Sequence, residues 1–212
     1  MQTITIPRPA VRRGRPRSAD IDRAILRTAT ELLARDGLAR MSIEEVAARA
    51  GVGKTTIYRR WQSKGALALD AFLAEFQAQQ PPPDTGTLRG DMLAALRAWI
   101  RAVTATSAGT MLADLVAAAQ RDAALAQAWR DRVIEPLRTQ HKIMLDRAAA
   151  RGEIPATTDR EVVLDLLFGA AYHRLLQGHR ALNDSFARSV VDVIISGLPG
   201  APAHREPPAS GS

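Results

Sequence analysis

The sequence predicts an all-α protein built from two helical domains. Alanine is abundant and aromatic residues make up only 4% of the 212 residues, which favours close-packed helices over a β-sandwich. From residue 18 onward, apolar side chains recur at the three- and four-residue spacing of amphipathic helices. The run Pro81-Pro82-Pro83 stops this pattern and predicts a stiff linker. We therefore expect a smaller domain at 18–80 and a larger one at 84–198, with disordered segments at 1–17 and 199–212.

The composition argues against several classes of protein. The chain has no cysteine, so a disulfide framework or a thiolate metal site is excluded. Its four histidines show no metal-ligand spacing and no nucleophile–base pair is recognisable, so we expect no metal, no cofactor and no catalysis. No apolar run approaches the roughly 20 residues that span a bilayer, and no signal-peptide apolar region is present. These features predict a cytoplasmic protein that does not contact the membrane.

The net charge is concentrated in the first third of the chain. Residues 1–67 contain 14 basic and 6 acidic residues, whereas residues 68–212 contain 15 and 16. Such asymmetry is typical of an anion-binding head on a near-neutral body. A merely solvated basic surface remains the alternative interpretation.

Residues 1–17 form a predicted basic arm. Three prolines and the run Arg12-Arg13-Gly14-Arg15-Pro16-Arg17 disfavour a helix. The Gly-Arg-Pro centre resembles an AT-hook, which lies in the minor groove, where narrow A·T-rich DNA attracts arginine. The candidate DNA contacts are Arg13, Arg15 and Arg17. A nonspecific electrostatic arm is the alternative.

The sequence pattern of residues 18–80 predicts four helices. An apolar stripe from Ile21 to Leu33 ends at Asp36-Gly37. Ser42, with Glu45 three residues later, is a capping box that opens a helix over 43–50. Gly51 breaks that helix, a short helix follows at about 54–61, and Ser63 is the expected N-cap of a fourth. Two short helices around a glycine-containing turn predict a helix-turn-helix at about 42–61.

The stretch ARAGVGKTT at 48–56 also differs by one residue from a phosphate-binding loop, G-x-x-x-x-G-K-[ST]. That loop needs a buried strand directly before it, and SIEEVAARA has the cap and apolar spacing of a helix. The first glycine of the pattern is also missing. A nucleotide hydrolase using residues 48–55 is therefore a minor alternative.

The second helix of the helix-turn-helix presents side chains that suit DNA. Lys54, Thr55, Thr56 and Arg59 are expected on its outer face, where lysine can donate to guanine and the threonine methyl can contact thymine. Donors around this helix can also bind backbone phosphates and position it without reading sequence. These are Tyr58, Arg60 and Lys64.

The segment AGVGKTTIYRRWQSKGALALDAF resembles the signature of the TetR family of bacterial transcriptional repressors. The resemblance covers about residues 19–67. It implies that Lys54, Thr55 and Thr56 contact bases and phosphates, that Tyr58 and Lys64 bind phosphates, and that Ser42 takes the place of a helix-two threonine or serine. The departures from the usual pattern are Arg60 for histidine, Trp61 for phenylalanine, and Gly53 for a frequent serine.

In the larger domain, the spacing of apolar residues predicts further helices at 88–106, 110–120, 122–151, 158–175 and 183–198. Pro136 interrupts the third of these, either as a kink that lines a cavity or as a simple break between two helices. Thr158 to Glu161 reads as a second capping box. LRGDMLAALRAW, QRDAALAQAWRDRVIEPLR and GAAYHRLL resemble one common subgroup of C-terminal domains in the family.

The last two helices are apolar on more than one face, which is typical of a helix that meets both its own core and a partner. The resemblance implies that they form a four-helix bundle across a two-fold dimer. A symmetric dimer also suits palindromic half-sites in DNA. The candidate interface residues are Leu167, Ala171, Leu175, Phe186, Val190, Val193 and Ile194.

A small-molecule pocket is expected in the same domain. His141 and His173 are possible polar anchors, although the neighbouring Lys142 favours a surface position for His141. An aromatic or methionine stripe at helical spacing is more often core than binding site, so a simple core is the competing interpretation. The candidate ligand contacts are Trp99, Met111, Leu115, Trp129, His141, Met144, Phe168 and Tyr172.

Together these features predict a homodimeric regulator that binds a palindromic operator in double-stranded DNA and leaves it when a small-molecule inducer binds. We expect a bacterial protein that associates with the nucleoid when bound to DNA. The principal alternative is an architectural minor-groove protein driven by the arginine arm.

Overall fold

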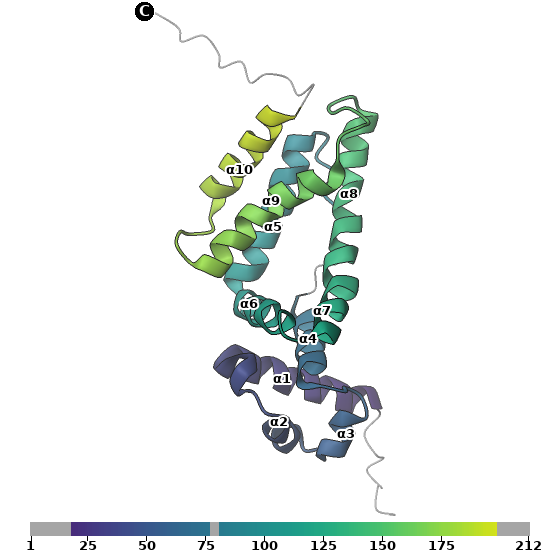
Figure 1. Ribbon diagram of the computed structural model, residues 1–212, viewed down its shortest axis with the longest axis vertical. Helices are drawn as coiled ribbons and strands as arrows, with labels where there is room; N and C mark the ends of the chain where they lie inside the picture. The colour runs from purple at the N-terminus through teal and green to yellow at the C-terminus, as the bar shows by residue number, and fades with distance from the viewer. Residues whose placement is uncertain (1–17, 77–80, 199–212) are drawn as a thin grey trace, which may run out of the picture.

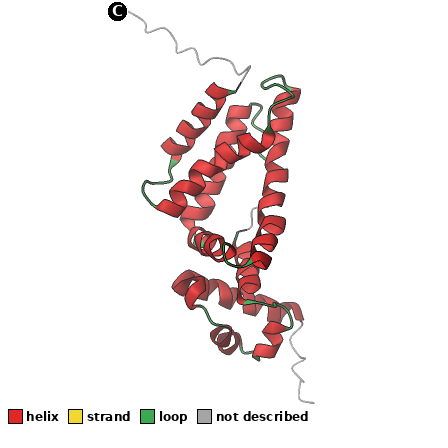
Figure 2. Cartoon of the chain, viewed as in Figure 1, coloured by secondary structure: helices red, strands yellow, loops and turns green. Residues whose placement is uncertain are grey.

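A computed structural model describes residues 18–76 and 81–198, and within these ranges the chain is helical with no strand (Figures 1 and 2). The arm, residues 77–80 and the tail lie outside the described residues. The head at the bottom of Figure 1 consists of α1 (Ser18–Arg40), α2 (Ile43–Ala50), α3 (Lys54–Tyr58) and α4 (Lys64–Glu75).

The body above it contains the remaining helices, ordered α5 to α10. The all-α fold class is confirmed, and most boundaries fall within two residues of the expected ones. The helices are α5 (Leu88–Ala105), α6 (Ala108–Ala119), α7 (Ala123–Trp129), a π-helical turn (Arg130–Ile134), α8 (Glu135–Ala150), α9 (Arg160–Gln177) and α10 (Asp184–Gly197).

The ends of α1 and α2 follow the sequence signals closely. Gly37 leaves helical geometry at φ 75° and ψ 166°, after which the chain makes one more turn to Arg40. Ser42 caps α2, its Oγ accepting from the Glu45 backbone N–H at 3.1 Å. The Glu45 side chain instead accepts from Arg35 at 2.9 Å, so only half of the predicted capping box forms. Gly51 ends α2 in the left-handed region at φ 69°.

Helix α3 is shorter than expected, ending at Tyr58 instead of Trp61. Its N-cap, Gly53, offers no side-chain oxygen to the free amides, so nothing in the sequence reinforces its start. The turn that follows keeps helical hydrogen bonds, with Trp61 N–H donating to Ile57 C=O at 2.9 Å. Ser63 then caps α4 by accepting from Ala66 N–H at 3.1 Å.

Pro136 neither kinks one helix nor separates two. A π-helical turn at Arg130–Ile134 joins α7 to α8, and Pro136 lies in the first turn of α8. The wider turn accommodates a residue that has no N–H to donate. Leu137 and Arg138, which follow the π-helical turn, line a cavity, but the irregularity ahead of them is a π-helical turn and neither of the two alternatives.

The expected capping box before α9 needs correction. The N-cap is Asp159, not Thr158, and its carboxylate accepts from the N–H groups of Glu161 and Val162 at 2.9 and 3.2 Å. Thr158 is taken up by a turn in which its own N–H donates to Pro155 C=O at 3.0 Å. The turn that begins at Pro155, three residues before the expected N-cap, occupies Thr158, and the helix starts one residue later than expected.

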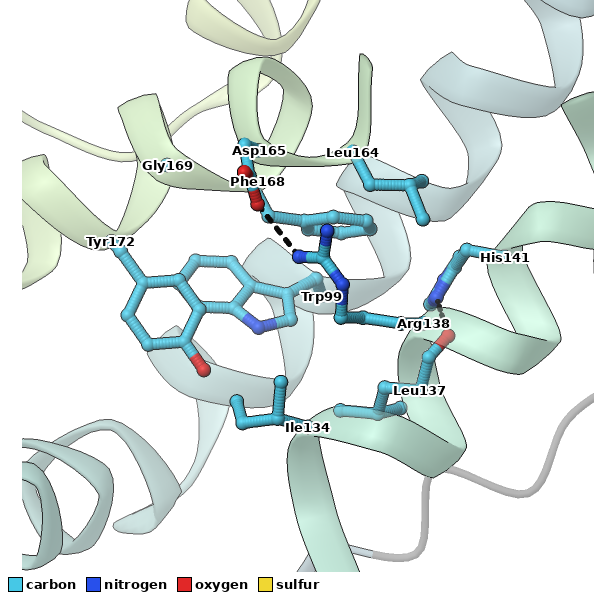
Figure 3. Close-up of a pocket in the computed structure, with 10 residues that line it drawn as sticks. All are labelled: Trp99, Ile134, Leu137, Arg138, His141, Leu164, Asp165, Phe168, Gly169 and Tyr172. Carbon is cyan, nitrogen blue, oxygen red and sulfur yellow. Dashed lines mark hydrogen bonds and ion pairs between the residues drawn. The ribbon is translucent and has the colours of Figure 1, made fainter. Parts of the chain in front are cut away.

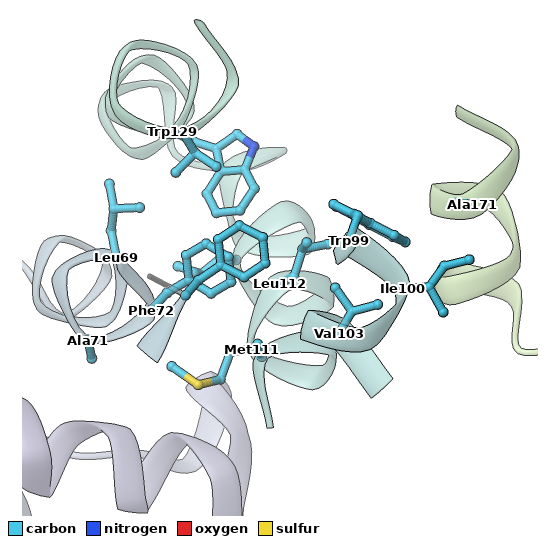
Figure 4. Packing of buried hydrophobic residues seen from close by; sticks show 14 of the residues in the cluster. Leu69, Ala71, Phe72, Trp99, Ile100, Val103, Met111, Leu112, Trp129 and Ala171 are labelled. Atoms are coloured by element: carbon cyan, nitrogen blue, oxygen red, sulfur yellow. The ribbon is translucent and has the colours of Figure 1, made fainter. Parts of the chain in front are cut away.

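Head and body share one hydrophobic core. Helix α6 packs against both α1 and α4. Phe72 of α4 lies against Trp129 of α7 with ring centroids 5.3 Å apart, beside Met111 of α6 (Figure 4). Asp114 of α6 accepts from the Leu38 N–H at 2.7 Å. Helix α6 therefore connects the body to the head through both apolar packing and a hydrogen bond.

No single described helix is long and apolar enough to cross a membrane. Helices α5 and α6 pass a test of length and composition only together, and they meet at 92°.

Candidate nucleic-acid interface and effector cavity

The candidate recognition surface is the outer side of α3. Ile57 is fully buried and Trp61 is 7% exposed, so these two side chains anchor α3 and its following turn to the head. The Trp61 indole N–H also donates to Asp70 of α4 at 2.8 Å. The opposite side of α3 carries the predicted contacts Lys54, Thr55 and Tyr58, all exposed.

Lys54 is held in place by a carboxylate of α2. Its ammonium donates to Glu44 at 3.0 Å, with both side chains more than half exposed. This hydrogen bond lowers the pKa of Glu44. DNA phosphates or base acceptors can replace a solvent-exposed carboxylate as partner at small cost, because such pairs contribute little in water.

Tyr58 has the features of a phosphate donor. It is 51% exposed, and among the described residues its hydroxyl has no hydrogen-bond partner. Arg59 is exposed beside it, and Thr56 is partly buried. The three side chains and Lys54 occupy one short helical segment, so they can face the same stretch of DNA.

Three further predicted contacts, besides Lys54, make internal bonds. Arg60 is only 15% exposed, forms an ion pair with Asp22 of α1 and donates to Thr56 C=O at 3.2 Å. Lys64 donates to Ala39 C=O at 3.1 Å. Ser42 caps α2. In this structure these three side chains hold the helices of the head in place, whereas Arg13, Arg15 and Arg17 lie outside the described residues.

A cavity of about 320 Å³ opens between α5, α8 and α9 (Figure 3). It brings together four of the eight predicted ligand contacts, one from α5, one from α8 and two from α9. These are Trp99, His141, Phe168 and Tyr172. The helices also contribute Ile134, Leu137, Arg138, Leu164, Asp165 and Gly169.

The other four predicted contacts lie in the core and not in the cavity wall. Met111, Leu115 and Met144 are at most 1% exposed, and Trp129 packs on Phe72. Their side chains follow the same helical spacing as the lining residues, and sequence periodicity does not distinguish a core position from a cavity position.

His141 lines the cavity and does not occupy the surface position that its neighbour Lys142 had suggested. Its ring lies edge-on to Phe168 at 4.8 Å between centroids and lines the cavity. Burial lowers its pKa, so the imidazole is neutral. Its Nδ1 lies 2.6 Å from the Leu137 carbonyl, which can only accept, so Nδ1 carries the proton and Nε2 is a lone-pair acceptor. His173 lies outside the lining and packs on His179.

A charged cluster at the edge of the cavity was not predicted from the sequence. Arg138 Nε donates to Glu161 at 2.6 Å and its Nη1 donates to Asp165 at 2.7 Å. Lys142 forms an ion pair with Glu161 as well. The four-residue spacings of Arg138 with Lys142 and of Glu161 with Asp165 are the signal that could have found two facing charged edges.

The predicted dimer-interface residues differ in how far they are exposed on the protomer. Leu167 and Ala171 are fully buried within the protomer, while Phe186 and Ile194 are 7% exposed. Leu175 and Val190 are partly buried, and Val193 is 71% exposed. The large apolar side chains that α9 and α10 expose are Val162, Leu166, Leu176 and Val193.

Within residues 18–76 and 81–198, no group of three or more histidine, aspartate or glutamate side chains is arranged to hold a metal ion.

A small helical head with an exposed recognition helix, joined to a larger helical body with a cavity, defines a helix-turn-helix regulator. Residues 25–71 match the model of the tetR family of bacterial regulatory proteins, and residues 82–194 match the tetracyclin repressor-like C-terminal domain. The chain belongs to the TetR family and is a DNA-binding transcriptional regulator.

Several known proteins are similar to this chain over most of its length. The DNA-binding transcriptional repressor TetR of Mycobacteroides abscessus is 38% identical, covering 90% of this chain and 99% of its own. The HTH-type transcriptional regulator YdeS of Bacillus subtilis is 36% identical, covering 85% and 90%. The crystal structure of the TetR family regulator SCO0332 superposes with a TM-score of 0.70 at 38% identity, covering 84% and 98%.

Proposed function

We propose that this chain is a homodimeric repressor that binds a palindromic operator and is released by a small molecule in the cavity between α5, α8 and α9. The single observation that carries the DNA-binding part is the exposure of Lys54, Thr55 and Tyr58 on one short helix that Ile57 and Trp61 anchor. In a dimer, two such helices would enter successive major grooves about one helical turn of DNA apart.

The proposed release follows from the shared core. Trp99 and Tyr172 line the cavity, and the core continues from α5 through α6 to α1 and α4 of the head. A ligand that binds one body conformation more tightly shifts the population toward it. If that conformation spaces the two heads wrongly for successive grooves, operator affinity falls by the ratio of the ligand's two affinities.

The experiment that tests the proposal is selection of bound sequences from random duplex DNA by the full-length protein. The salt concentration must be fixed near the physiological value, since phosphate contacts dominate affinity at low ionic strength. We expect an enriched palindrome. Enrichment of A·T-rich DNA without symmetry would instead support the architectural alternative based on residues 1–17.

Variants make the test specific. Lys54→Ala combined with Tyr58→Phe should weaken binding to the selected operator, whereas Trp99→Ala, in the cavity, should spare it. Operator affinity that is unchanged in the double variant would contradict the assignment of α3 as the recognition helix.

A further inference from the structure

The cavity between α5, α8 and α9 has a lining whose chemistry restricts what it can bind. This inference rests on the proposed function, because it concerns the ligand of the same site. The cavity volume of about 320 Å³ is at the small end for ligand sites. Trp99 and Tyr172 lie with ring centroids 5.2 Å apart, facing Phe168 and His141. Aromatic faces favour a flat ligand through offset stacking.

The charges at the cavity are mutually compensated. Arg138 is shared between Glu161 and Asp165, and Lys142 also pairs with Glu161. An anionic ligand approaching Arg138 would meet two carboxylates that already hold it. A cationic ligand approaching Asp165 would meet the guanidinium. Because neither charge sign finds an unpaired partner, a charged ligand would lose its hydration without compensation.

The uncharged polar groups of the lining are, in contrast, unpaired. Neither the Trp99 indole N–H nor the Tyr172 hydroxyl has a hydrogen-bond partner among the described residues. His141 uses Nδ1 toward Leu137 and leaves Nε2 as an acceptor. A ligand that leaves buried donors and acceptors unpaired is penalised. An acyl chain is polar at one end only, so it would leave most of these donors and acceptors without a hydrogen-bond partner.

From these three features we propose that the cavity binds an uncharged planar aromatic molecule of one or two rings. Its polar edge accepts a hydrogen bond from Trp99 or Tyr172 and donates one to His141.

A series of four probes that differ in charge or in shape tests this ligand class. The probes are 2-naphthol, 2-naphthoate, 2-naphthylmethylammonium and decanoate, titrated into the full-length protein by calorimetry at pH 7.5 without DNA. We expect 2-naphthol to bind at least about tenfold more tightly than the other three. Equal or tighter binding of any other probe would overturn the proposal, as would the absence of binding by 2-naphthol.

Matched variants locate the site. Tyr172→Phe removes one donor and keeps the ring, whereas Trp99→Phe removes the other donor and replaces the indole with a smaller aromatic ring, so each should weaken 2-naphthol binding by about two- to tenfold. Tyr58→Phe in α3 and Trp129→Phe in the core, the matched changes outside the cavity, should leave it unchanged. The same affinity in all four variants would show that the probe binds elsewhere.

Asp165→Asn tests the charge argument directly. It removes one of the two carboxylates on Arg138, so the affinity for 2-naphthoate should rise severalfold while that for 2-naphthol stays nearly constant. No gain for 2-naphthoate would contradict the role assigned to charge compensation.

A separate readout distinguishes failure of this inference from failure of the proposed function. Operator affinity without any probe tests the repressor alone. If 2-naphthoate binds the cavity and releases the operator, the repressor stands and the ligand class is wrong. If 2-naphthol binds without releasing the operator, the ligand class stands and the release mechanism is wrong.

Discussion

Tyr58 and Tyr172, the two tyrosines of the chain, show how position gives one type of side chain two different candidate functions. Tyr58 is 51% exposed on α3, where its hydroxyl can meet a phosphate. Tyr172 is enclosed by the cavity wall, and burial raises its pKa to about 12. The sequence indicated both functions, the first through a motif and the second only as one of many apolar candidates.

At Tyr58, loss of the hydroxyl should weaken operator binding. A hydrogen bond contributes about 1 kcal/mol, so Tyr58→Phe should raise the operator Kd roughly fivefold. Titration of a labelled operator at fixed salt measures this change. Tyr172→Phe is the matched control and should leave the operator Kd unchanged. An equal loss in both variants would show that the effect does not arise at the DNA surface.

His141 should make stability depend on pH. Burial lowers its pKa in the folded state, so below about pH 6.5 the unfolded chain binds a proton there more readily than the folded chain does. This contribution destabilises the fold as pH falls below about 6.5 and is constant above that pH. The drop in Tm from pH 7.5 to pH 5.5 should therefore be smaller in His141→Gln than in the wild type.

A matched substitution isolates the effect of burial on His141. His173→Gln alters an exposed imidazole and should reproduce the wild-type drop in Tm. A His141→Gln protein with an undiminished drop would contradict the desolvation argument.

Among the helices, the N-termini that a single capping side chain begins were the most predictable from the sequence. Ser42 and Ser63, the predicted N-caps, each accept from the backbone N–H three residues on. Asn183 does the same ahead of α10, although only the helix and not its cap was predicted. The π-helical turn at Arg130–Ile134 was not predicted, because no local pattern distinguishes a π turn from an α-helix ahead of a proline. The Arg138 cluster was missed for a related reason, since it requires α8 and α9 to be placed side by side.

The turn of the helix-turn-helix gives a prediction at this scale. Gly51 has φ 69°, and nothing lies within 4 Å of an added Cβ. Gly51→Ala should therefore cost about 1–2 kcal/mol through backbone strain alone. This corresponds to a fall in Tm of roughly 2–8 °C, measured by circular dichroism.

Gly53 is the matched control in the same turn. Its φ is −77°, and an added Cβ would meet only Thr55 at an ordinary 3.6 Å. Gly53→Ala should change Tm by little. Equal destabilisation by both substitutions would show that the turn is sensitive to bulk and not to left-handed geometry.

For the whole molecule, we expect the exposed apolar surface of α9 and α10 to form the dimer interface. Arg89 pairs with Asp192, and Arg97 pairs with Asp184, so ion pairs fix α10 on α5. This leaves Val193 on the outer side. The sequence predicted that these two helices meet a partner, yet it placed buried residues such as Leu167 at the interface. Both faces of such a helix are apolar, and only the packed structure shows which one faces inward.

Leu166, 56% exposed on α9, should lie in the dimer interface. A carboxylate buried there without a partner would be costly, so Leu166→Glu should raise the dimer dissociation constant by about a hundredfold or more. Sedimentation velocity over a concentration series measures this change. Operator affinity should fall with it, because one head on one half-site lacks the support of the second. Ile143→Glu is the control, since Ile143 is 40% exposed but belongs to α8 and not to α9 or α10. It should leave both the dimer and operator binding intact. If Leu166→Glu stays dimeric at nanomolar concentration, the exposed face of α9 is not the interface, and the palindrome must be matched by another surface.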